Sequence, residues 1–412
     1  MDKQIRSIIQ AEQNRQHNEI NLIASENYAN QAILDLQGSV LTNKYAEGYP
    51  NARYYAGCGP SDEVESLAIS LGKQLFQAGF MNVQPHSGSS ANAAVYQALM
   101  SPGDAILGLS IKDGGHLTHG VKVNFSGQMY TPYYFGIKDC NHIDYDDLYH
   151  KATTHKPKVI VVGYSSFSGL VDWQICRQIA DDVGAYLLAD IAHISGLVAA
   201  GLYPSPVAFA DVCTSTTHKT LRGPRGGIIF GRANEEIERK INKAVFPGSQ
   251  GGPLMHVVAA KAQAFSDALL PSFKEYQQQT LANAKALSEA LVAEGFTVMG
   301  EGTENHMLVI DCRSLELTGA EAEKRLDENG IIVNRNAIKN DPKPPRVTSG
   351  LRLGVPAVTT RCMKEAEMRH LAHLIRGVLI DGQTVLHEVK QLCDAFPVPM
   401  GNYAESLKPL DQ

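Results

Sequence analysis

A single lysine in the segment TSTTHKTLRGPRGG, residues 214–227, is surrounded by small hydrogen-bonding side chains. Four hydroxyl-bearing residues precede His218 and Lys219, and two arginines follow among glycine and proline. At the end of a strand the amine of Lys219 would be partly desolvated, which favours its neutral, nucleophilic form. These residues leave two interpretations open: a solvated basic loop, or a lysine that does covalent chemistry beside a phosphate.

Short apolar segments rich in branched residues alternate with helical segments over much of the chain. The clearest are VIVVGYSS, AYLLADIAH, DVCTSTTHK and GGIIFG. This alternation predicts an α/β layer with a largely parallel, buried sheet. Because ligands bind at the carboxyl ends of such strands, four chemically active residues are expected at one edge: Ser165, Asp190, His193 and Lys219.

After residue 280 the pattern changes to a long amphipathic helix followed by short strands and helices, which predicts a smaller α+β domain. The chain is therefore expected to comprise an N-terminal helical arm over residues 1–24, a large domain over 25–280 and a small C-terminal domain over 281–412. In the large domain, the helix predicted over PSDEVESLAISLGKQLFQA has Ser61 as its N-cap.

Two motifs offer partners for a phosphate and for a heterocyclic nitrogen. HSGSSAN, residues 86–92, combines small residues with the start of a helix, as anion-binding turns do, although Gly-Ser before a helix is often only a cap. Asp190 is either a helix N-cap or the negative charge that keeps a ring nitrogen protonated.

GGHLTHG, residues 114–120, places His116 and His119 three positions apart, which raises the question of a metal. Zinc requires further ligands, and no neighbouring cysteine or acidic cluster clearly supplies them. We therefore expect no metal here. A histidine between glycines can instead lay its ring over a flat ligand.

KYAEGYPNARYY, residues 44–55, contains Tyr45, Glu47, Tyr54 and Tyr55 around glycine and proline. It is either a surface loop or an aromatic substrate loop whose carboxylate carries a proton. Arg352, in GLRLG, lies on a predicted strand of the smaller domain. Its guanidinium group suits bidentate capture of a substrate carboxylate, and a plain surface arginine is the alternative.

The composition excludes several classes of protein. The 412 residues include 37 Lys and Arg against 43 Asp and Glu, a net charge of −6, which argues against a broad nucleic-acid surface. The seven cysteines are scattered and never spaced as CxxC, which disfavours a disulfide framework. The amino terminus lacks the pattern of a signal or transit peptide, and no apolar run reaches about 18 residues. A cytoplasmic protein without membrane or nucleic-acid partners is expected.

Taken together, the motifs resemble the serine hydroxymethyltransferase family over essentially the whole chain. The segments that carry the resemblance are NLIASENY, KYAEGYP with RYY, PHSGSSAN, GGHLTHG, DIAHISGLVAAG, TSTTHKTLRGPRGG, PGSQGGPLMH, NDPKPP and TSGLRLG. The resemblance implies an α/β PLP-dependent transferase fold of type I, in which a large domain with a mostly parallel seven-stranded sheet precedes a smaller C-terminal α+β domain. It also implies a homodimer, or a pair of dimers, with active sites shared across the interface.

The implied reaction is the reversible transfer of the serine hydroxymethyl carbon to tetrahydrofolate, which gives glycine and 5,10-methylenetetrahydrofolate. Pyridoxal 5'-phosphate (PLP) would be the cofactor and tetrahydrofolate the cosubstrate. A threonine aldolase-like PLP enzyme without folate dependence is the alternative. A non-enzymatic binder of phosphorylated ligands or RNA, built around HSGSSAN and the Lys219–Arg225 segment, is a third possibility, and the net charge of −6 argues against RNA.

The resemblance also implies a role for each motif residue at the cofactor. Lys219 would carry PLP covalently as a Schiff base, Asp190 would pair with the ring nitrogen and His116 would stack on the ring. The remaining cofactor contacts would be His193 and Ser165 near the ring hydroxyl, Gly88, Ser89 and His218 at the phosphate, and Tyr45 and Gly252 reaching that phosphate from the partner subunit. Thr216 and Arg225 are expected to position the lysine.

Substrate and folate contacts follow from the same resemblance. The amino-acid carboxylate would be held by Ser25, Arg352 and the partner's Tyr55, with His193 nearby and Glu47 as proton carrier at the serine hydroxyl. The folate contacts would be Glu47, Tyr54, Ile111, Gly115, Leu117 and Asn336. The chain departs from the family pattern at residues 111–113, at Val355 and at Arg346, and the first and last of these border the expected folate pocket.

Overall fold

The computed structural model describes residues 2–138 and 141–399, and it divides the chain into two compact units. The central unit comprises residues Ala32–Gln278, and the terminal unit combines Met1–Gln31 with Gln279–Gln412. The predicted domain boundaries after residues 24 and 280 stay a prediction. Cys140 lies outside the described residues; the other six cysteines are free thiols.

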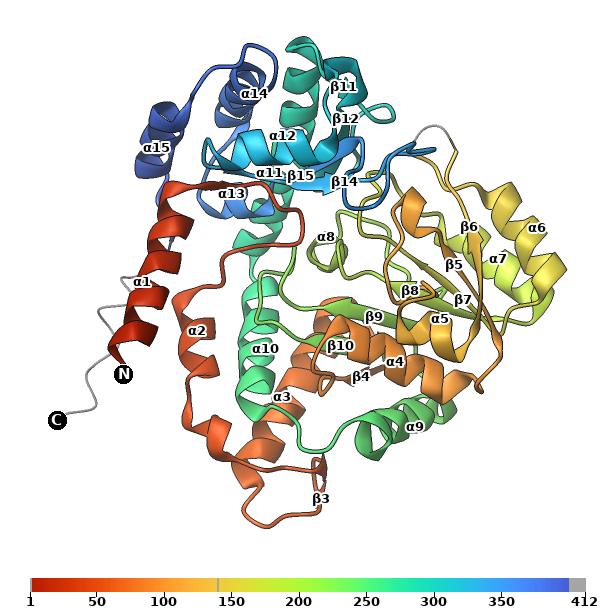
Figure 1. The fold of residues 1–412 in the computed structure, drawn as a ribbon. Helices are drawn as coiled ribbons and strands as arrows, with labels where there is room; N and C mark the ends of the chain where they lie inside the picture. The colour runs from red at the N-terminus through yellow and green to blue at the C-terminus, as the bar shows by residue number, and fades with distance from the viewer. Residues whose placement is uncertain (1, 139–140, 400–412) are drawn as a thin grey trace. The chain divides into compact units, whose positions relative to one another are not determined.

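A seven-stranded sheet forms the middle of the central unit, in the order β4-β10-β9-β8-β7-β5-β6 (Figure 1). The strands are β4 (Phe80–Asn82), β5 (Ala105–Leu109), β6 (Thr131–Phe135), β7 (Val159–Gly163), β8 (Tyr186–Asp190), β9 (Val212–Thr216) and β10 (Gly227–Gly231). β10 runs antiparallel to both neighbours, and the other pairings are parallel. The predicted α/β layer with a mostly parallel seven-stranded sheet is confirmed.

Every residue of β7, β9 and β10 is buried, because helices cover both faces of a parallel sheet. The helices and turns of the central unit are α2 (Gln31–Gln37), η1 (Val40–Asn43), α3 (Gly59–Phe76), α4 (Gly88–Leu99), η2 (Ile111–Asp113), α5 (Phe125–Met129), α6 (Tyr145–His155), α7 (Trp173–Val183), α8 (Ser195–Ala199), α9 (Glu235–Lys243), η3 (Ala244–Ser249) and α10 (Met255–Ala268). A short hairpin joins β2 (Gly48–Tyr49) to β3 (Ala52–Arg53). α3 packs on α10, and α4 packs on β9 and β10.

The predicted start of α3 is wrong. The helix begins at Gly59, after Cys58 in the N-cap position, and Ser61 is buried within the first turn. Pro60 explains the shift, since its fixed φ suits a first helical turn and its missing N–H costs nothing there. Leu67, on the same helix, is 52% exposed.

The terminal unit is the expected α+β arrangement. Its antiparallel sheet has the order β11-β12-β15-β14, and β1 pairs in parallel with β13. The elements are α1 (Lys3–Asn18), β1 (Ile20–Asn21), β11 (Thr297–Val298), β12 (Met307–Asp311), η4 (Arg313–Leu315), α12 (Gly319–Asp327), β13 (Ile331–Ile332), β14 (Asn334–Asn336), β15 (Gly350–Gly354), α13 (Pro356–Thr360), α14 (Glu365–Leu379) and α15 (Leu386–Ala395). α11 (Pro271–Ala293) crosses from one unit to the other. Within the described residues, no helix combines the length and the apolarity that crossing a bilayer requires.

One buried arginine ties the two ends of the terminal unit together. Arg361 is 2% exposed, and its guanidinium group donates to four backbone carbonyls. The acceptors are those of Phe396 (2.6 Å), Glu19 (2.8 Å), Cys393 (3.0 Å) and His17 (3.1 Å). These bonds join α1 to α15, which lie side by side in Figure 1.

Replacing this arginine should therefore destabilise the terminal unit. We expect Arg361→Met to lower the free energy of unfolding by about 3 kcal/mol, because buried carbonyls lose their donors. Urea denaturation followed by circular dichroism measures the change. Arg369→Met, at an exposed position of α14, is the control and should stay within about 0.5 kcal/mol. Equal effects of the two substitutions would contradict the assignment.

Candidate active site

Three parallel strands bring their carboxyl ends to one edge of the central sheet. Gly163 at the end of β7 is in register with Asp190 at the end of β8, which is in register with Thr214 of β9. The residues that follow these strand ends are therefore neighbours, as ligand sites in parallel sheets require. This edge carries Ser165, Asp190, His193 and the Lys219 loop.

Asp190 is a buried carboxylate surrounded by hydrogen-bond donors. Its Oδ2 accepts from Asn92 Nδ2 (2.8 Å) and from His119 Nε2 (3.0 Å), and its Oδ1 accepts from the N–H of Ala192 (3.1 Å). Burial alone raises its pKa, but the contacts of His119, His116 and Asn92 together hold the pKa of Asp190 well below its usual range. The residue is therefore an anion at neutral pH.

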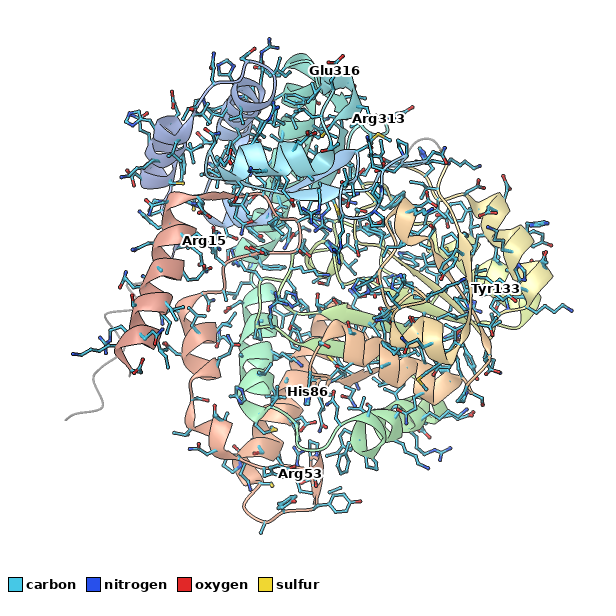
Figure 2. The ribbon with its side chains drawn as sticks, viewed as in Figure 1. Arg15, Arg53, His86, Tyr133, Arg313 and Glu316 are labelled. Carbon is cyan, nitrogen blue, oxygen red and sulfur yellow. The ribbon has the colours of Figure 1, made fainter. Side chains whose placement is uncertain are left out.

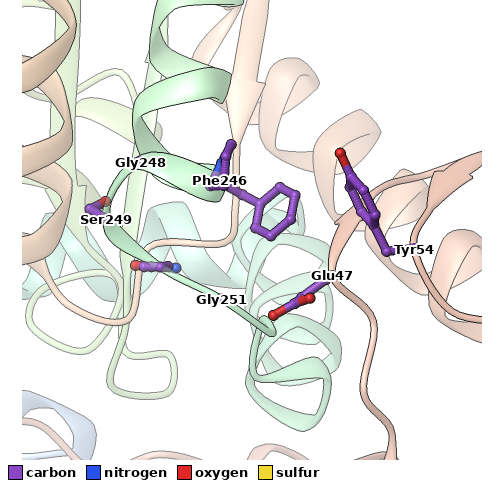
Figure 3. A pocket seen from close by; sticks show the side chains of 8 residues that line it. Glu47, Tyr54, Phe246, Gly248, Ser249 and Gly251 are labelled. Atoms are coloured by element: carbon purple, nitrogen blue, oxygen red, sulfur yellow. The ribbon is translucent and has the colours of Figure 1, made fainter.

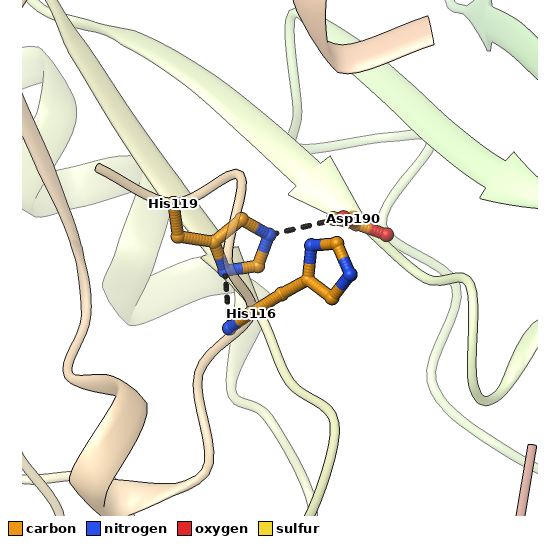
Figure 4. A group of neighbouring side chains, drawn as sticks. All are labelled: His116, His119 and Asp190. Carbon is orange, nitrogen blue, oxygen red and sulfur yellow. Dashed lines mark hydrogen bonds and ion pairs between the residues drawn. The ribbon is translucent and has the colours of Figure 1, made fainter. Parts of the chain in front are cut away.

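The two histidines of GGHLTHG differ in their roles (Figure 4). His119 Nδ1 accepts from the backbone N–H of His116 (3.4 Å), so that the hydrogen on Nε2 is the one donated to Asp190. His116 Nδ1 lies 2.8 Å from the hydroxyl of Thr118, which in turn accepts from Asn92 (2.8 Å). Burial lowers the pKa of His116 to about 4, and its ring is neutral at pH 7.

Asp190 supplies the acidic neighbour that sequence spacing did not reveal for these histidines. Donor atoms of His116, His119 and Asp190 lie within 4.8 Å of one another, as a metal site would require. However, both ring nitrogens of His119 are already engaged in hydrogen bonds. The geometry is that of a hydrogen-bonded triad, and the expectation of no metal stays a prediction.

The loop between β9 and β10 holds Lys219, whose side chain is 8% exposed. The loop turns tightly: the N–H of Arg222 donates to the carbonyl of Lys219 (3.0 Å), and that of Gly223 to Thr217 (2.7 Å). The Thr217 hydroxyl donates to the carbonyl of Pro224 (2.6 Å). The threonines around the lysine thus hold the backbone of its loop, so that the loop needs no bulky side chain.

His218 has an unusual environment beside this lysine. Its Nδ1 is buried and has no hydrogen-bond partner among residues 2–138 and 141–399. Burial, helped by the charges of Lys219 and Arg225, lowers the pKa of His218 to about 3. A buried ring nitrogen without a partner is costly, and a bound ligand would relieve that cost.

The amino end of α4 faces the same loop. Ser87 caps the helix by accepting from the N–H of Ser90 (3.1 Å). Helix geometry leaves the N–H groups of Gly88 and Ser89 without an acceptor in the helix, which favours an anion at this end. A Cβ on Gly88 would lie 2.7 Å from Thr216 Cγ2. Only glycine therefore permits this approach between α4 and β9.

The neighbouring turns are tied to these elements. The buried His193 accepts at its carbonyl from the hydroxyl of Thr220 (2.9 Å), which links the turn after β8 to the Lys219 loop. The N–H of Ser165 donates to the carbonyl of Gly114 (2.6 Å), which links β7 to the segment over residues 114–120. The backbone thus fixes the positions of both residues.

Two apolar side chains of the same region face solvent. Ile111 is 44% exposed and Leu117 is 47% exposed. Between them, Gly115 packs so closely on Leu109 that an added Cβ would meet its carbonyl oxygen. Exposed apolar side chains beside a polar site suit a ligand with a flat apolar part.

The aromatic loop forms a second cluster with residues far along the chain. The rings of Tyr45 and Tyr55 lie 5.1 Å apart edge to face, and Tyr54 lies 5.5 Å from Phe246. A Cβ on Gly252 would lie 3.2 Å from Tyr45 Cζ. Tyr45, Tyr54, Tyr55 and Gly252, singled out in separate motifs, therefore belong to one surface of the central unit.

A pocket of about 560 Å³ opens in this cluster (Figure 3). Glu47 and Tyr54 line one side of it, and residues 246–251 line the other. Glu47 lies against Gly251, where an added Cβ would be 3.0 Å from Oε1. The carboxylate is thus held at the wall of a cavity that is open to solvent.

Arg53 fixes the loop that carries these residues (Figure 2). It forms ion pairs with Asp62 (2.7 Å) and with the buried Glu65 (2.6 Å) of α3. Its Nη1 donates to the carbonyls of Ala46 and Gly48, each at 2.9 Å. The loop is therefore held rigidly by α3.

The remaining candidate residues belong to the terminal unit. Arg352 lies in β15, donates from Nε to Asn334 Oδ1 (3.0 Å), and has a pKa lowered by burial to about 10, which leaves it charged at neutral pH. The N–H of Gly354, on the same strand, donates to the carbonyl of Leu22 (2.8 Å), just before the turn that contains Ser25. Asn336, on β14, lies opposite Gly350 of β15.

Sequence reasoning missed several residues of the two clusters. Asn92 and Thr118 join the Asp190 network, and residues 246–251 line the pocket. His119 was considered only as a metal ligand, although it orients Asp190. Asn92 closes the motif HSGSSAN, and its position one turn into the helix was the available signal.

The buried His218 should make folding stability depend on pH. Its folded pKa of about 3 lies below the ordinary 6.5, so the unfolded chain binds more protons between these values. The contribution of the neutral His218 ring to the free energy of unfolding is therefore complete above pH 6.5, and it is lost as the pH falls towards 3. We expect His218→Asn to reduce the fall in the urea midpoint between about pH 6.5 and 4.5. His150→Asn, at an exposed site on α6, should not change that fall. An equally steep fall in the His218 variant would refute the assignment.

Comparison with known proteins completes the description of the site. The sequence profile of the family described as "Serine hydroxymethyltransferase" matches residues 1–375. A protein named serine hydroxymethyltransferase from Legionella pneumophila (strain Lens) is 56% identical over 397 residues, which cover 95% of each chain. Proteins of the same name from Alkalilimnicola ehrlichii and Halorhodospira halophila are 55% and 54% identical over 404 and 403 residues. These alignments cover 96% of this chain, and 96% and 97% of the respective relatives.

Proposed function

The chain belongs to the serine hydroxymethyltransferase family, and we propose which of its residues carry out the reaction of that family. The enzyme transfers the hydroxymethyl carbon of serine to tetrahydrofolate, with PLP as its cofactor, and glycine is the other product. The family assignment favours this reaction over the threonine aldolase-like alternative. The observation that carries the residue assignments is the buried, ionised Asp190 at the same sheet edge as Lys219.

The chemistry of this edge fits PLP. Asp190 offers a negative charge to a cationic ring nitrogen, and the neutral ring of His116 lies close to it. The amino end of α4 and the unpartnered His218 Nδ1 suit a phosphate. When bound, PLP withdraws electrons from the α-carbon of the amino acid through its protonated ring.

Each residue of the edge then has a distinct task. Lys219, which is 8% exposed, would hold the cofactor covalently through its side-chain amine. Asp190 keeps the ring nitrogen protonated, and His119 and Asn92 keep Asp190 ionised. His116 would stack on the ring, and His193 and Ser165 would contact the ring hydroxyl. Gly88, Ser89 and His218 would hold the phosphate.

Substrate binding is assigned to the terminal unit. Arg352 is charged, buried and oriented by Asn334, which suits bidentate capture of the amino-acid carboxylate. Ser25 is proposed as a second donor to that carboxylate. Fixing the carboxylate selects which bond at the α-carbon is aligned for cleavage, which is a positioning effect.

The aromatic cluster is proposed to complete the active site of a partner subunit in a homodimer. Large apolar side chains are exposed in it and next to it in sequence, as expected of an interface: Tyr45, Tyr54, Tyr55 and Leu254. In that arrangement Tyr45 and Gly252 contact the phosphate, and Tyr55 contacts the carboxylate. Glu47 handles the proton at the serine hydroxyl.

Folate is proposed to bind next to this interface. Ile111 and Leu117 supply exposed apolar surface beside Gly115, and the partner's Tyr54 and Glu47 face the same ligand. Asn336 of the terminal unit is the remaining folate contact. We also propose a cytoplasmic location, which the free thiols of the described cysteines support.

The covalent role of Lys219 can be tested without measuring activity. Borohydride reduction of the PLP-loaded protein, followed by peptide mass spectrometry, should place the cofactor on the peptide that contains Lys219. Lys219→Gln should carry no label, whereas Lys151→Gln, on α6, should be labelled as fully as the unsubstituted protein. Label on another lysine in the unsubstituted protein would overturn the assignment.

Hybrid dimers test the sharing of sites across subunits. A Glu47→Gln chain and a Lys219→Gln chain should each be inactive alone. A purified hybrid of the two should recover about half of the unsubstituted activity, since one of its two sites combines intact residues from both chains. A hybrid of the unsubstituted chain with Lys219→Gln is the control and should also show about half. An inactive double-variant hybrid would place Glu47 in the site of its own chain.

A further inference from the structure

A second buried lysine lies outside the residues assigned above. Lys261 of α10 is 1% exposed, and its ammonium group donates to three backbone carbonyls. The acceptors are the carbonyls of Val83 (2.6 Å), Gly227 (2.8 Å) and Pro85 (3.0 Å). Three N–H donors thus meet three acceptors, which is the full capacity of a protonated lysine.

The two segments that Lys261 joins both lead directly to the proposed phosphate site. Residues 83–85 follow β4 and precede the cap of α4, where Gly88 and Ser89 begin the helix. Gly227 opens β10, immediately after the loop that contains His218 and Lys219. The ammonium group therefore sets the spacing between the two chain segments that hold the phosphate.

The surrounding contacts leave little freedom at this junction. The N–H of Gly227 donates to the carbonyl of Pro85 (3.0 Å), and a Cβ on Gly227 would meet the carbonyl oxygen of Ser87. A Cβ on Gly226 would meet the Cε of Lys261 itself. Gly226 and Gly227, the last two glycines of the GPRGG segment, thus permit the close approach of Lys261 and of Ser87 at this junction.

The charge of Lys261 also reaches the phosphate-binding segment. Burial lowers the pKa of His86, and the positive charge of Lys261 lowers it further. Burial lowers the pKa of Lys261 itself to about 7, while the negative charge of Glu65 opposes that change. The three carbonyl acceptors also favour the charged form, because a neutral amine has only two N–H groups to donate.

We propose that Lys261 is a positioning residue for cofactor binding, which fixes the two segments of the phosphate site at one spacing and adds positive charge beside them. The inference rests on the proposed phosphate contacts of Gly88, Ser89 and His218. It predicts that Lys261 affects the binding of the phosphate group of PLP, and not the binding of its ring.

Comparison of PLP with pyridoxal, which lacks the phosphate, tests this. Lys261→Met retains the apolar stem and removes the donors and the charge. We expect the dissociation constant of PLP from the holoenzyme to rise about tenfold or more, and that of pyridoxal to change less than about threefold. An unchanged PLP constant, or an equal rise for both compounds, would overturn the proposal. If Lys261→Met does not fold, Lys261→Gln provides the same comparison.

Two further variants distinguish a failure of the role proposed for Lys261 from a failure of the assigned phosphate site. Arg361→Met removes another buried cation that binds backbone carbonyls, but in the terminal unit; it should lower stability without changing the ratio of the two constants. If Arg361→Met changed the ratio of the PLP and pyridoxal dissociation constants to a similar extent, the effect of Lys261→Met would be explained by general destabilisation. Ser89→Ala tests the phosphate site itself. If Ser89→Ala changes the ratio and Lys261→Met does not, only the role of Lys261 fails. If neither does, the assigned phosphate site fails.

Discussion

A carboxylate buried away from water has to be surrounded by hydrogen-bond donors, and Asp190 imposes this requirement on the central unit. An unpaired charge at this position would cost several kcal/mol. The donors come from three directions: Asn92 from α4, His119 from the glycine-rich segment and the backbone after β8. Asn92 in turn accepts from the hydroxyl of Thr214 on β9 (2.6 Å). The hydrogen bonds centred on this carboxylate therefore fix how α4, the glycine-rich segment, β8 and β9 pack together.

Each unit contains a buried cation, Lys261 in the central unit and Arg361 in the terminal unit, and both use the same kind of hydrogen-bond acceptor. Lys261 and Arg361 each donate to backbone carbonyls at the ends of helices, strands and loops. Carbonyls in the interior need donors, and leaving them unpaired is costly. A long side chain with several donors satisfies them together, and so joins segments that are far apart in sequence.

The sequence predicted the parts of this protein that depend on local patterns. The apolar strands β7 to β10 and the residues at their carboxyl ends follow from such patterns. β4, β5 and β6 were not singled out; β4 has only three residues, and β6 is an edge strand that contains Pro132. The partner of His119 could not be predicted from spacing, since Asp190 lies 71 residues away. Lys261 resembles any polar residue of a helix until its three acceptors are known.

The composition of the terminal unit has a consequence for the order in which the protein can fold during synthesis. Its first 31 residues leave the ribosome early, yet their partners lie at the other end of the chain. Arg361 is 342 residues beyond Glu19, which corresponds to about 20 to 70 s of translation. The central unit is complete well before then. The amino-terminal segment therefore cannot form these contacts until Arg361 and α15 have been synthesised, and it is accessible to chaperones and proteases during that time.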